Sequence, residues 1–341
     1  MRFEFYHPGL ENTPKLSVDG TVDENSIHLS HWEGNHTPPE LRADTSTEIA
    51  LNFVAAANRN ELTGRIDLVT NNHFDTDGVL SVWTVLKGES ALDLREQLIA
   101  AAEAGDFSEF TSENGVRASI VIQGADQAGG NNDTASPLAQ MLSGEDRLDD
   151  ARCYELVLPE VEKVLTQTDN YESLWRAGWN QVEKSLESFA CGSSTVTEFP
   201  QAELSLITLA PEIFSASGFD PTRHAAPYTA ISYNARGKLF VIAVPASSGW
   251  IYRIDYPYYS WAETVVRPPV RRHDLTSLLD QLNQLEQIPS GTWQVDHSEM
   301  TSAAKFLGAD GLAAASKLTP DIVASIVCAQ LAGDKLSISA N

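Results

Sequence analysis

The most constraining feature of the sequence is a strand-like segment, a polar turn and a helix-like segment that follow one another directly. Residues 65–70 (RIDLVT) have the composition of a strand, and residues 78–86 (GVLSVWTVL) have that of a helix. Between them lies NNHFDTD, a turn that carries one histidine and two aspartates. In α/β proteins such turns lie at the carboxyl edge of a parallel sheet, where ligands bind. The segment therefore predicts an α/β fold with a candidate ligand site in this turn.

The first 110 residues contain further elements of the same kind. Residues 15–20 and 26–31 read as short strands, and residues 45–58 and 92–104 read as helices. Asp44 or Thr45 can cap the helix that begins near residue 45, and Glu48 stands at capping-box distance from Thr45. We therefore expect a parallel-sheet N-terminal domain with helices on both faces.

The second half of the chain has a different pattern. After a loop rich in Gly, Asn and Asp at residues 123–137, a strongly helical stretch spans 154–190. The later segments alternate short strands with helices: strands at 204–209, 229–234, 238–244, 249–256 and 292–295, and helices at 274–287 and 320–331. The pattern predicts a metal-binding α/β domain at 1–150. At 151–341 it predicts a helical connector and a smaller α+β lobe with antiparallel strands.

Composition limits the possible partners. The chain has 341 residues and a net charge of −24, so its field repels long nucleic acids and anionic membranes. A small phosphorylated substrate remains possible, because metal ions and local arginines can reverse the potential inside a site. Neither a membrane span nor a signal peptide is evident, and the three cysteines are widely separated, which favours a reducing cytoplasm. The oligomeric state is left open.

The turn itself offers metal-ligand chemistry. In an extended segment alternate residues point the same way, so His73, Asp75 and Asp77 can converge on one point. One imidazole with two carboxylates suits Mn²⁺, Fe²⁺ or Zn²⁺, and carboxylate-rich sets favour Mn²⁺ or Mg²⁺. A calcium loop of the EF-hand type is excluded, because Leu86 occupies the twelfth position counted from Asp75. The alternative is an ordinary polar turn between a strand and a helix.

The segment IDLVTNNHFDTDGVLSVW resembles the first motif of the DHH phosphoesterase superfamily, in which an apolar strand precedes H-x-D-x-D-G. The resemblance implies that His73, Asp75 and Asp77 hold a pair of metal ions, Mn²⁺ or Mg²⁺. It covers about a quarter of the chain and includes nothing after Phe107. The chain as a whole also resembles an uncharacterised family of bacterial proteins, which adds no mechanism.

The name-giving Asp-His-His motif of that superfamily is matched in outline by Ser30-His31-Trp32. The resemblance implies that His31 is a metal ligand. Trp32 replaces the histidine that contacts the substrate phosphate, and Ser30 replaces the aspartate. Asn35 matches the asparagine that often follows the motif, and His36 is the candidate for the phosphate contact that Trp32 does not provide.

Two further aspartates complete the implied ligand set. Asp19 in VDG is similar to the superfamily's second motif, and Asp106 in AGDF is a candidate for the last ligand. The motifs then stand in a permuted order, with His31 ahead of NHFDTDG. Asp19 before Gly20 is equally typical of a turn, and Asp106 can simply end a helix. If the permuted reading is correct, Asp19, His31 and NHFDTDG follow neighbouring parallel strands.

The second half of the chain has one dense basic cluster, RPPVRRH at 267–273. Arginine forks bind phosphate oxygens bidentately, so Arg271 and Arg272 are candidates for substrate binding. The alternative is a segment of salt bridges between lobes. We expect one of these two arginines to face the metal ligands across a cleft.

Two functions remain open at this stage. The first is a hydrolase that acts on a phosphoester or phosphoanhydride through a binuclear metal-activated water, with His31, Asp75 and Asp77 as catalytic residues. The second is a catalytically inactive binding or regulatory protein of the same fold, which the replacement of Asp-His-His by Ser30-His31-Trp32 suggests. Sequence signatures of serine hydrolases, P-loop enzymes, dinucleotide-binding proteins and zinc metalloproteases are missing.

Overall fold

The computed structural model describes residues 1–22, 25–123, 138, 149–213, 228–286, 291–297 and 300–338. Its chain divides into two compact units. Of the described residues, those up to Asn180 and those within Trp261–Pro269 form the first unit, and those within Gln181–Ser260 and from Val270 onward form the second. A short segment from late in the chain therefore belongs to the first unit. Apart from Gln123, the loop expected at 123–137 lies outside the described residues.

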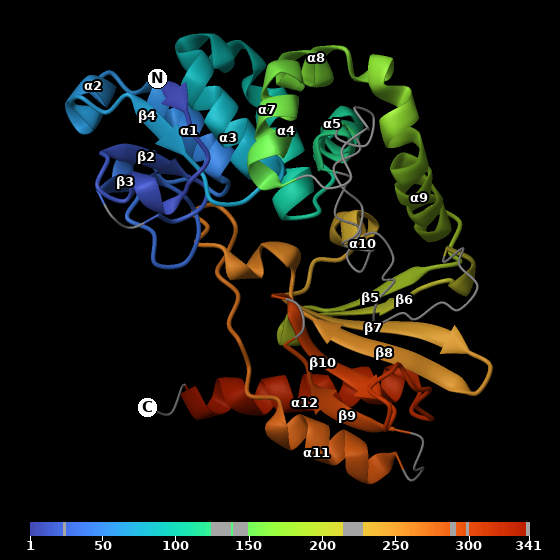
Figure 1. The fold of residues 1–341 in the computed structure, drawn as a ribbon. Helices are drawn as coiled ribbons and strands as arrows, with labels where there is room; N and C mark the ends of the chain where they lie inside the picture. The colour runs from blue at the N-terminus through green and yellow to red at the C-terminus, as the bar shows by residue number, and fades with distance from the viewer. Residues whose placement is uncertain are drawn as a thin grey trace. The chain divides into compact units, whose positions relative to one another are not determined.

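The first unit is built on a parallel sheet (Figure 1). Its strands, in the spatial order β1-β4-β2-β3, are β1 (Arg2–Phe3), β4 (Leu68–Thr70), β2 (Lys15–Val18) and β3 (Ser26–Leu29). Every residue of β2 and β4 is buried, as in sheets covered by helices. The α-helices of this part of the chain are α1 (Ser46–Ala55), α2 (Arg59–Thr63), α3 (Thr76–Lys87), α4 (Arg95–Asp106), α5 (Glu113–Gln123), α7 (Asp150–Val157), α8 (Val161–Thr166) and α9 (Glu172–Ala190).

Helix α3 contacts β1, β2 and β4, and α1 contacts β3 and packs along α3. The sequence already marked both helix starts. Asp75 caps α3 by accepting a hydrogen bond from the Gly78 N–H, and Thr45 caps α1 by accepting one from the Glu48 N–H. Of the two caps proposed for α1, Thr45 is therefore the one that is used. Both starts face the carboxyl edge of the sheet, because each helix follows a strand.

The second unit contains a mixed six-stranded sheet with the order β5-β6-β7-β8-β10-β9. Its strands are β5 (Thr195–Phe199), β6 (Leu204–Thr208), β7 (Leu239–Ala246), β8 (Gly249–Asp255), β9 (Thr292–Val295) and β10 (Ser302–Leu307). Only β6 and β7 pair in parallel, and the other neighbours are antiparallel. The helices are α10 (Tyr228–Asn234), α11 (Thr276–Leu285) and α12 (Pro320–Ile338).

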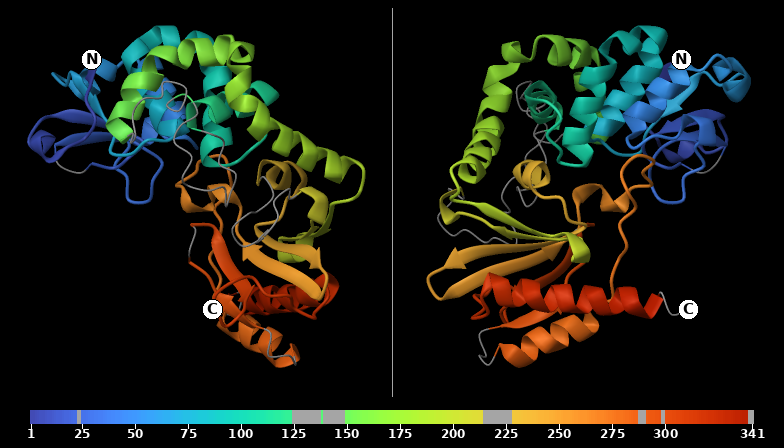
Figure 2. Two further views of the ribbon diagram at one scale, coloured as in Figure 1. Left: turned by 45° about the vertical axis from the view of Figure 1, so that its right-hand side comes forward. Right: turned by 180° about the vertical axis from the view of Figure 1, so that it is seen from behind.

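The two faces of this sheet bury different helices (Figure 2). Leu206, Val241 and Ile254 pack on the side of α11 and α12, while Ile207 and Ile242, which alternate with them, pack on the side of α10. The fold class predicted from the sequence is confirmed: a parallel-sheet α/β part and an α+β part with antiparallel strands. The strand expected at 229–234 is wrong, because these residues form α10. In α10, Tyr228 and Ile231 are three residues apart and pack in the same core as residues of β7. This spacing places both side chains on one face of a helix.

Replacement of Thr45 with alanine should lower the free energy of unfolding by about 1 kcal/mol, because the Glu48 N–H loses its cap acceptor. Thr45→Ser keeps the hydroxyl and serves as the matched control. Urea denaturation followed by circular dichroism measures both variants. An equal loss in the two variants would show that the methyl group of Thr45, and not its hydroxyl, stabilises α1.

Candidate metal centre

The carboxyl ends of three neighbouring strands bring the candidate residues together. β2 pairs in parallel with both β3 and β4. Asp19 directly follows β2, His31 follows β3, and His73 follows β4. The predicted arrangement on neighbouring parallel strands is confirmed, because three chain segments end at one edge of the sheet.

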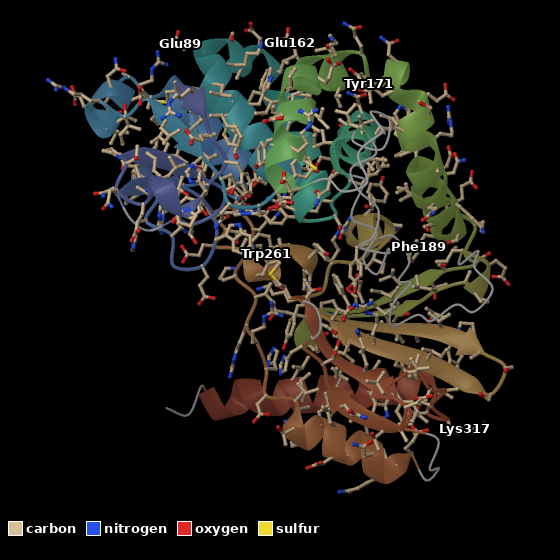
Figure 3. All side chains as sticks on the ribbon, in the orientation of Figure 1. Glu89, Glu162, Tyr171, Phe189, Trp261 and Lys317 are labelled. Atoms are coloured by element: carbon tan, nitrogen blue, oxygen red, sulfur yellow. The ribbon has the colours of Figure 1, made fainter. Side chains whose placement is uncertain are left out.

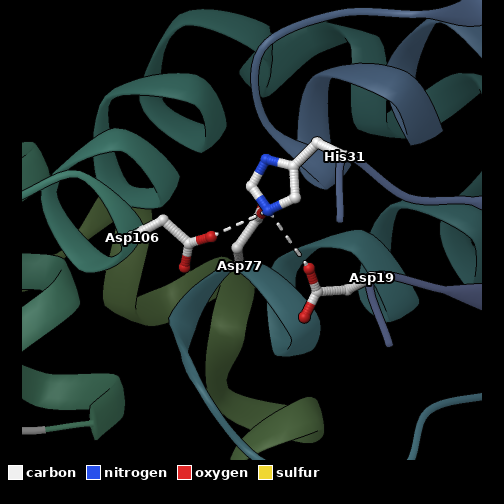
Figure 4. Close-up of side chains that lie close together, drawn as sticks. All are labelled: Asp19, His31, Asp77 and Asp106. Atoms are coloured by element: carbon white, nitrogen blue, oxygen red, sulfur yellow. Dashed lines mark ion pairs between the residues drawn. The ribbon is translucent and has the colours of Figure 1, made fainter. Parts of the chain in front are cut away.

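A first group of donor atoms comes from Asp19, His31, Asp77 and Asp106, and these atoms lie within 4.8 Å of one another (Figure 4). His31 Nε2 lies 3.1 Å from Asp106 Oδ2, 3.7 Å from Asp19 Oδ1 and 3.8 Å from Asp77 Oδ2. All four residues are buried. Four elements supply them, namely the ends of β2 and β3, the first turn of α3 and the end of α4.

A second group comes from Asp19, His73 and Asp75, and its donor atoms also lie within 4.8 Å of one another. His73 Nε2 lies 2.9 Å from Asp19 Oδ2 and 3.0 Å from Asp75 Oδ2. Asp19 therefore belongs to both groups, with one oxygen facing each histidine. The polar-turn reading of NHFDTDG is confirmed, because Asp75 caps α3 through Oδ1. Asp75 Oδ2 faces His73, and the metal-site reading stays a prediction.

The backbone of Asp19 has a φ of 62°, in the left-handed region that few residues other than Gly, Asn and Asp adopt. The turn predicted at Asp19-Gly20 is therefore present. The Asp19 side chain nevertheless turns inward, accepting a hydrogen bond from Ser46 Oγ at 2.9 Å. A Cβ at Gly20 would collide with Asn72 Oδ1 and Asn71 Oδ1, so a larger residue there would require both amide side chains to shift.

Neighbouring groups hold these side chains in place. His31 donates from Nδ1 to the Asp44 carbonyl at 2.6 Å, which leaves Nε2 facing the carboxylates. The N-terminus of α1 binds Asp77, whose two oxygens accept hydrogen bonds of 2.7 Å from the N–H groups of Ser46 and Thr47. The helix dipole adds to this attraction, because the N-terminus carries partial positive charge.

The charges in the site shift the ionisation of its members. Burial alone would lower the pKa of both histidines, but facing carboxylates raise that of His31 to about 10 and that of His73 to about 12. Burial and the Asp19 charge raise the pKa of Asp77 to about 7, and burial with the charges of Asp77 and Asp75 raises that of Asp106. Burial opposes ionisation of Asp19, yet the two histidines lower its pKa to about 2.

The donor atoms fit divalent metal ions. Asp19 Oδ2, His31 Nε2 and Asp106 Oδ2 are buried and make no hydrogen bond of normal geometry with any described residue. The distance between His31 Nε2 and Asp106 Oδ2 is nonetheless only 3.1 Å, and that between Asp19 Oδ2 and His73 Nε2 is 2.9 Å. These atoms form ion pairs but no hydrogen bond of normal geometry, an arrangement expected where buried donor atoms can share a cation. Each group combines one imidazole with two or three carboxylates. Such a ligand set suits Mn²⁺, and its carboxylates also suit Mg²⁺.

Two of the predicted substrate-binding residues are engaged elsewhere in the first unit. The Asn35 amide donates to the Trp32 carbonyl and to Glu263, and its oxygen accepts from the Thr37 N–H. His36 is exposed and its ring stacks on His28 with centroids 5.4 Å apart. Trp32 lies against His73 with ring centroids 5.3 Å apart. A phosphate contact by Asn35 or His36 stays a prediction.

The basic cluster at 267–273 divides between the units. Arg267 belongs to the first unit and pairs there with Asp44, Glu103 and Glu109, so its ion pairs lie within one unit. Arg272 belongs to the second unit, where it donates to Ser260 Oγ and the Met300 carbonyl. It lines a cavity of about 610 Å³ in that unit together with His273 and His297. Substrate binding by Arg271 and Arg272 stays a prediction.

Sequence reasoning missed the residues that orient the candidate metal ligands. Asp44, Ser46 and Thr47 were seen only as the start of a helix, and Arg267 only as part of a basic cluster. The signal available was TSTE at residues 45–48, which predicts a helix N-terminus and hence free N–H groups that bind an anion. Which anion binds there depends on long-range contacts, since Asp77 is 30 residues away from Thr47 in sequence.

Three comparisons place the chain among known proteins. A search of curated proteins gives no match. Among solved structures, the chain is similar to the pGpG-specific phosphodiesterase PggH from Vibrio cholerae, with 11% identity and a TM-score of 0.32. The alignment covers 86% of this chain and 98% of that one, and similarity of this degree assigns neither fold nor function.

No helix in the described part of the chain has the length and apolar character required to cross a membrane. The model of one protein family matches residues 2–331, nearly the whole sequence. The chain therefore belongs to the family described as "Family of unknown function (DUF6687)".

Proposed function

We propose that this protein is a metal-dependent hydrolase of a phosphoester or phosphoanhydride, with two Mn²⁺ or Mg²⁺ ions at the candidate centre. The observation that carries the proposal is the pair of ligand groups that share Asp19. His31, Asp77 and Asp106 would hold one ion, His73 and Asp75 would hold the other, and Asp19 would contribute to both. When bound, such ions lower the pKa of a coordinated water, so that hydroxide becomes available near neutral pH.

The chain's own residues prepare this chemistry. The Asp44 carbonyl keeps the Nδ1 proton on His31, and therefore presents Nε2 to the centre. The amides of Ser46 and Thr47 fix both oxygens of Asp77, which prevents that carboxylate from rotating away. Buried walls exclude bulk water from the His31 group, whose four members are all buried. His31, Asp75 and Asp77 are thus the residues proposed to serve catalysis.

The proposed substrate is a small phosphorylated molecule. The net charge of −24 disfavours a long nucleic acid, whereas bound cations would locally attract a phosphate. Arg271, Arg272, Asn35 and His36 are the residues proposed to contact it. We also propose a cytoplasmic location, because the three cysteines are free and free cysteines suit a reducing compartment.

A binding protein without catalysis is the second candidate. Its support is Trp32, whose ring lies against His73 and whose single N–H cannot replace the two ring nitrogens of a histidine. In that case the centre would bind metal and a phosphorylated ligand without turning the ligand over. Turnover assays separate the two candidates.

The test begins with metal analysis of the purified protein and titration with Mn²⁺. A panel of phosphomonoesters, phosphodiesters and pyrophosphate is then assayed with Mn²⁺ and with Mg²⁺. We expect turnover that is lost in Asp75→Asn, which removes a charge but keeps a helix cap. Asp67→Asn is the matched control, because Asp67 is exposed and directly precedes β4, whereas Asp75 follows that strand. A protein that binds no Mn²⁺ would refute the proposal, and metal binding without turnover would favour the binding protein.

A further inference from the structure

A segment from late in the chain packs around His31. Residues 261–267, termed the strap, lie in sequence between β8 and α11 but belong to the first unit. The Glu263 N–H donates to the His31 carbonyl at 2.7 Å. Trp261 (labelled in Figure 3) meets the His31 ring edge-on, with centroids 4.9 Å apart. The strap thus contacts both the backbone and the ring of a proposed metal ligand.

Asp44 binds both the strap and His31. Its carboxylate accepts hydrogen bonds from the backbone N–H groups of Val265, Val266 and Arg267. Its own carbonyl accepts the Nδ1 proton of His31. Asp44 is 1% exposed, so few alternative partners can reach its carboxylate. The position of the carbonyl that orients His31 therefore depends on how firmly the strap holds the Asp44 carboxylate.

Arg267 connects this anchor to the helix that carries Asp106. Its guanidinium donates to Asp44 Oδ2 at 2.8 Å, to Glu103 at 2.7 Å and to Glu109 at 2.6 Å. It also lies over the Phe107 ring, 4.8 Å from the centroid. Glu103 and Phe107 stand on either side of Asp106 at the end of α4. One planar guanidinium therefore fixes the loop that orients His31 relative to the helix end that presents Asp106.

We propose that Arg267 is a positioning residue that sets the distance between His31 and Asp106 and so tunes metal binding by the His31 group. This inference rests on the proposed function, because it assumes that the group binds a divalent ion. Outer residues that orient metal ligands commonly change metal affinity by roughly 10–100-fold when removed. A purely structural ion pair would instead change folding and leave the metal affinity of the folded protein unchanged.

The test measures Mn²⁺ affinity by calorimetry and by electron paramagnetic resonance in Arg267→Met and Arg267→Lys. We expect Arg267→Met to weaken binding by roughly 10-fold or more. Arg267→Lys should recover part of this loss, since an ammonium can reach one or two of the carboxylates but lacks the planar fork. In the metal-free protein, the ¹⁵N and ¹H signals of the His31 ring should shift in Arg267→Met, because the bond to the Asp44 carbonyl is disturbed.

The matched control is Arg117→Met. Arg117 is also a largely buried arginine of the first unit, which pairs with Glu113 and lies over the rings of Trp175 and Trp179. This variant should be less stable yet bind Mn²⁺ with wild-type affinity. If Arg267→Met does not fold, Asp44→Asn provides the same test, because it weakens the anchor while keeping the carbonyl.

The outcomes separate the two proposals. Folded Arg267→Met or Asp44→Asn with wild-type Mn²⁺ affinity and an unshifted His31 spectrum would overturn the role of Arg267 and leave the proposed function standing. A wild-type protein that binds no Mn²⁺ would instead overturn the metal centre itself. An equal loss of affinity in Arg117→Met would show a general effect of stability and would also overturn the inference.

Discussion

Replacement of Asp19 with asparagine is expected to remove both metal positions at once. Asp19 contributes to both ligand groups, with Oδ1 3.7 Å from His31 Nε2 and Oδ2 2.9 Å from His73 Nε2. Asparagine tolerates the left-handed backbone at this position, so the fold should survive. The variant loses the negative charge, and an NH₂ group, which cannot bind a cation, replaces one oxygen. We expect Mn²⁺ affinity to fall by more than the roughly 100-fold that loss of an orienting residue can cause.

Single-group variants provide the contrast. Asp106→Asn affects only the His31 group, and Asp75→Asn affects only the His73 group. Each should reduce the binding stoichiometry from two ions to one, while Asp19→Asn should leave no tight site. Titration with Mn²⁺ under calorimetry measures these numbers, and Asp67→Asn controls for the loss of one charge in the first unit. Two ions bound by Asp19→Asn with wild-type affinity would contradict the shared role of Asp19.

The second large effect concerns pH. In the metal-free protein, the folded state holds protons that the unfolded state releases. Burial opposes protonation of His31 and His73, but carboxylates raise their pKa values to about 10 and about 12. Their contribution to stability is therefore complete below about pH 6.5, the pKa of an unfolded histidine, and is lost as pH rises through the folded values. Each retained proton is worth up to about 1.4 kcal/mol per pH unit in this range.

Asp77 also makes the stability of the metal-free protein fall as pH rises above about 4. Burial and the Asp19 charge raise the pKa of Asp77 to about 7, so that its ionisation destabilises the fold as pH rises from about 4 to 7. Asp19 behaves oppositely: its pKa of about 2 gives stability that is present above about pH 4 and lost in stronger acid. The metal-free protein should therefore be most stable in weak acid and lose stability steadily from pH 6 to pH 9.

Bound Mn²⁺ should reverse this trend, because metal ligands must release their protons. We expect binding at pH 8 to release about two protons, one from each imidazole. Thermal denaturation from pH 5 to pH 9 with and without Mn²⁺ measures the stability, and calorimetry in buffers of different ionisation enthalpy measures the protons. A melting temperature of the metal-free protein that rises from pH 6 to pH 9 would contradict the expectation. His36→Gln serves as a control, because His36 is exposed and outside both groups.

Much of the site could be predicted from local pattern. NHFDTDG marked the end of a strand and the start of a helix, and the structure places Asp75 as the cap of α3. Strands β2, β3 and β4 were predicted because their apolar runs are short and end in polar or glycine turns, whereas β1, which has only two residues, was not predicted. Asp19, His31 and Asp106 came from a resemblance and not from spacing, since a lone aspartate or histidine in sequence carries no direction.

Local pattern failed where tertiary contacts decide. Residues 229–234 read as a strand because they are rich in β-branched and aromatic side chains, yet they form α10 against one face of the second sheet. The β-propensity of single residues does not decide the structure here, because a helix buries their apolar side chains against the neighbouring sheet. Strand β10 was not predicted either, because its sequence SAAKFL contains two alanines and none of the β-branched residues of a typical strand. The strand forms because it pairs with β8 on one side and β9 on the other.

Local residue patterns predicted the class of the fold, the start of α3 and the types of side chain available for metal, because these depend on residues near one another in the chain. The tertiary structure alone decided that Asp19 serves two groups and that Ser46 and Thr47 bind Asp77. It also decided that a strap from residues 261–267 holds His31. The reason is that parallel strands and a returning segment bring together residues separated by up to 232 positions, and no periodicity in a single sequence records such pairings.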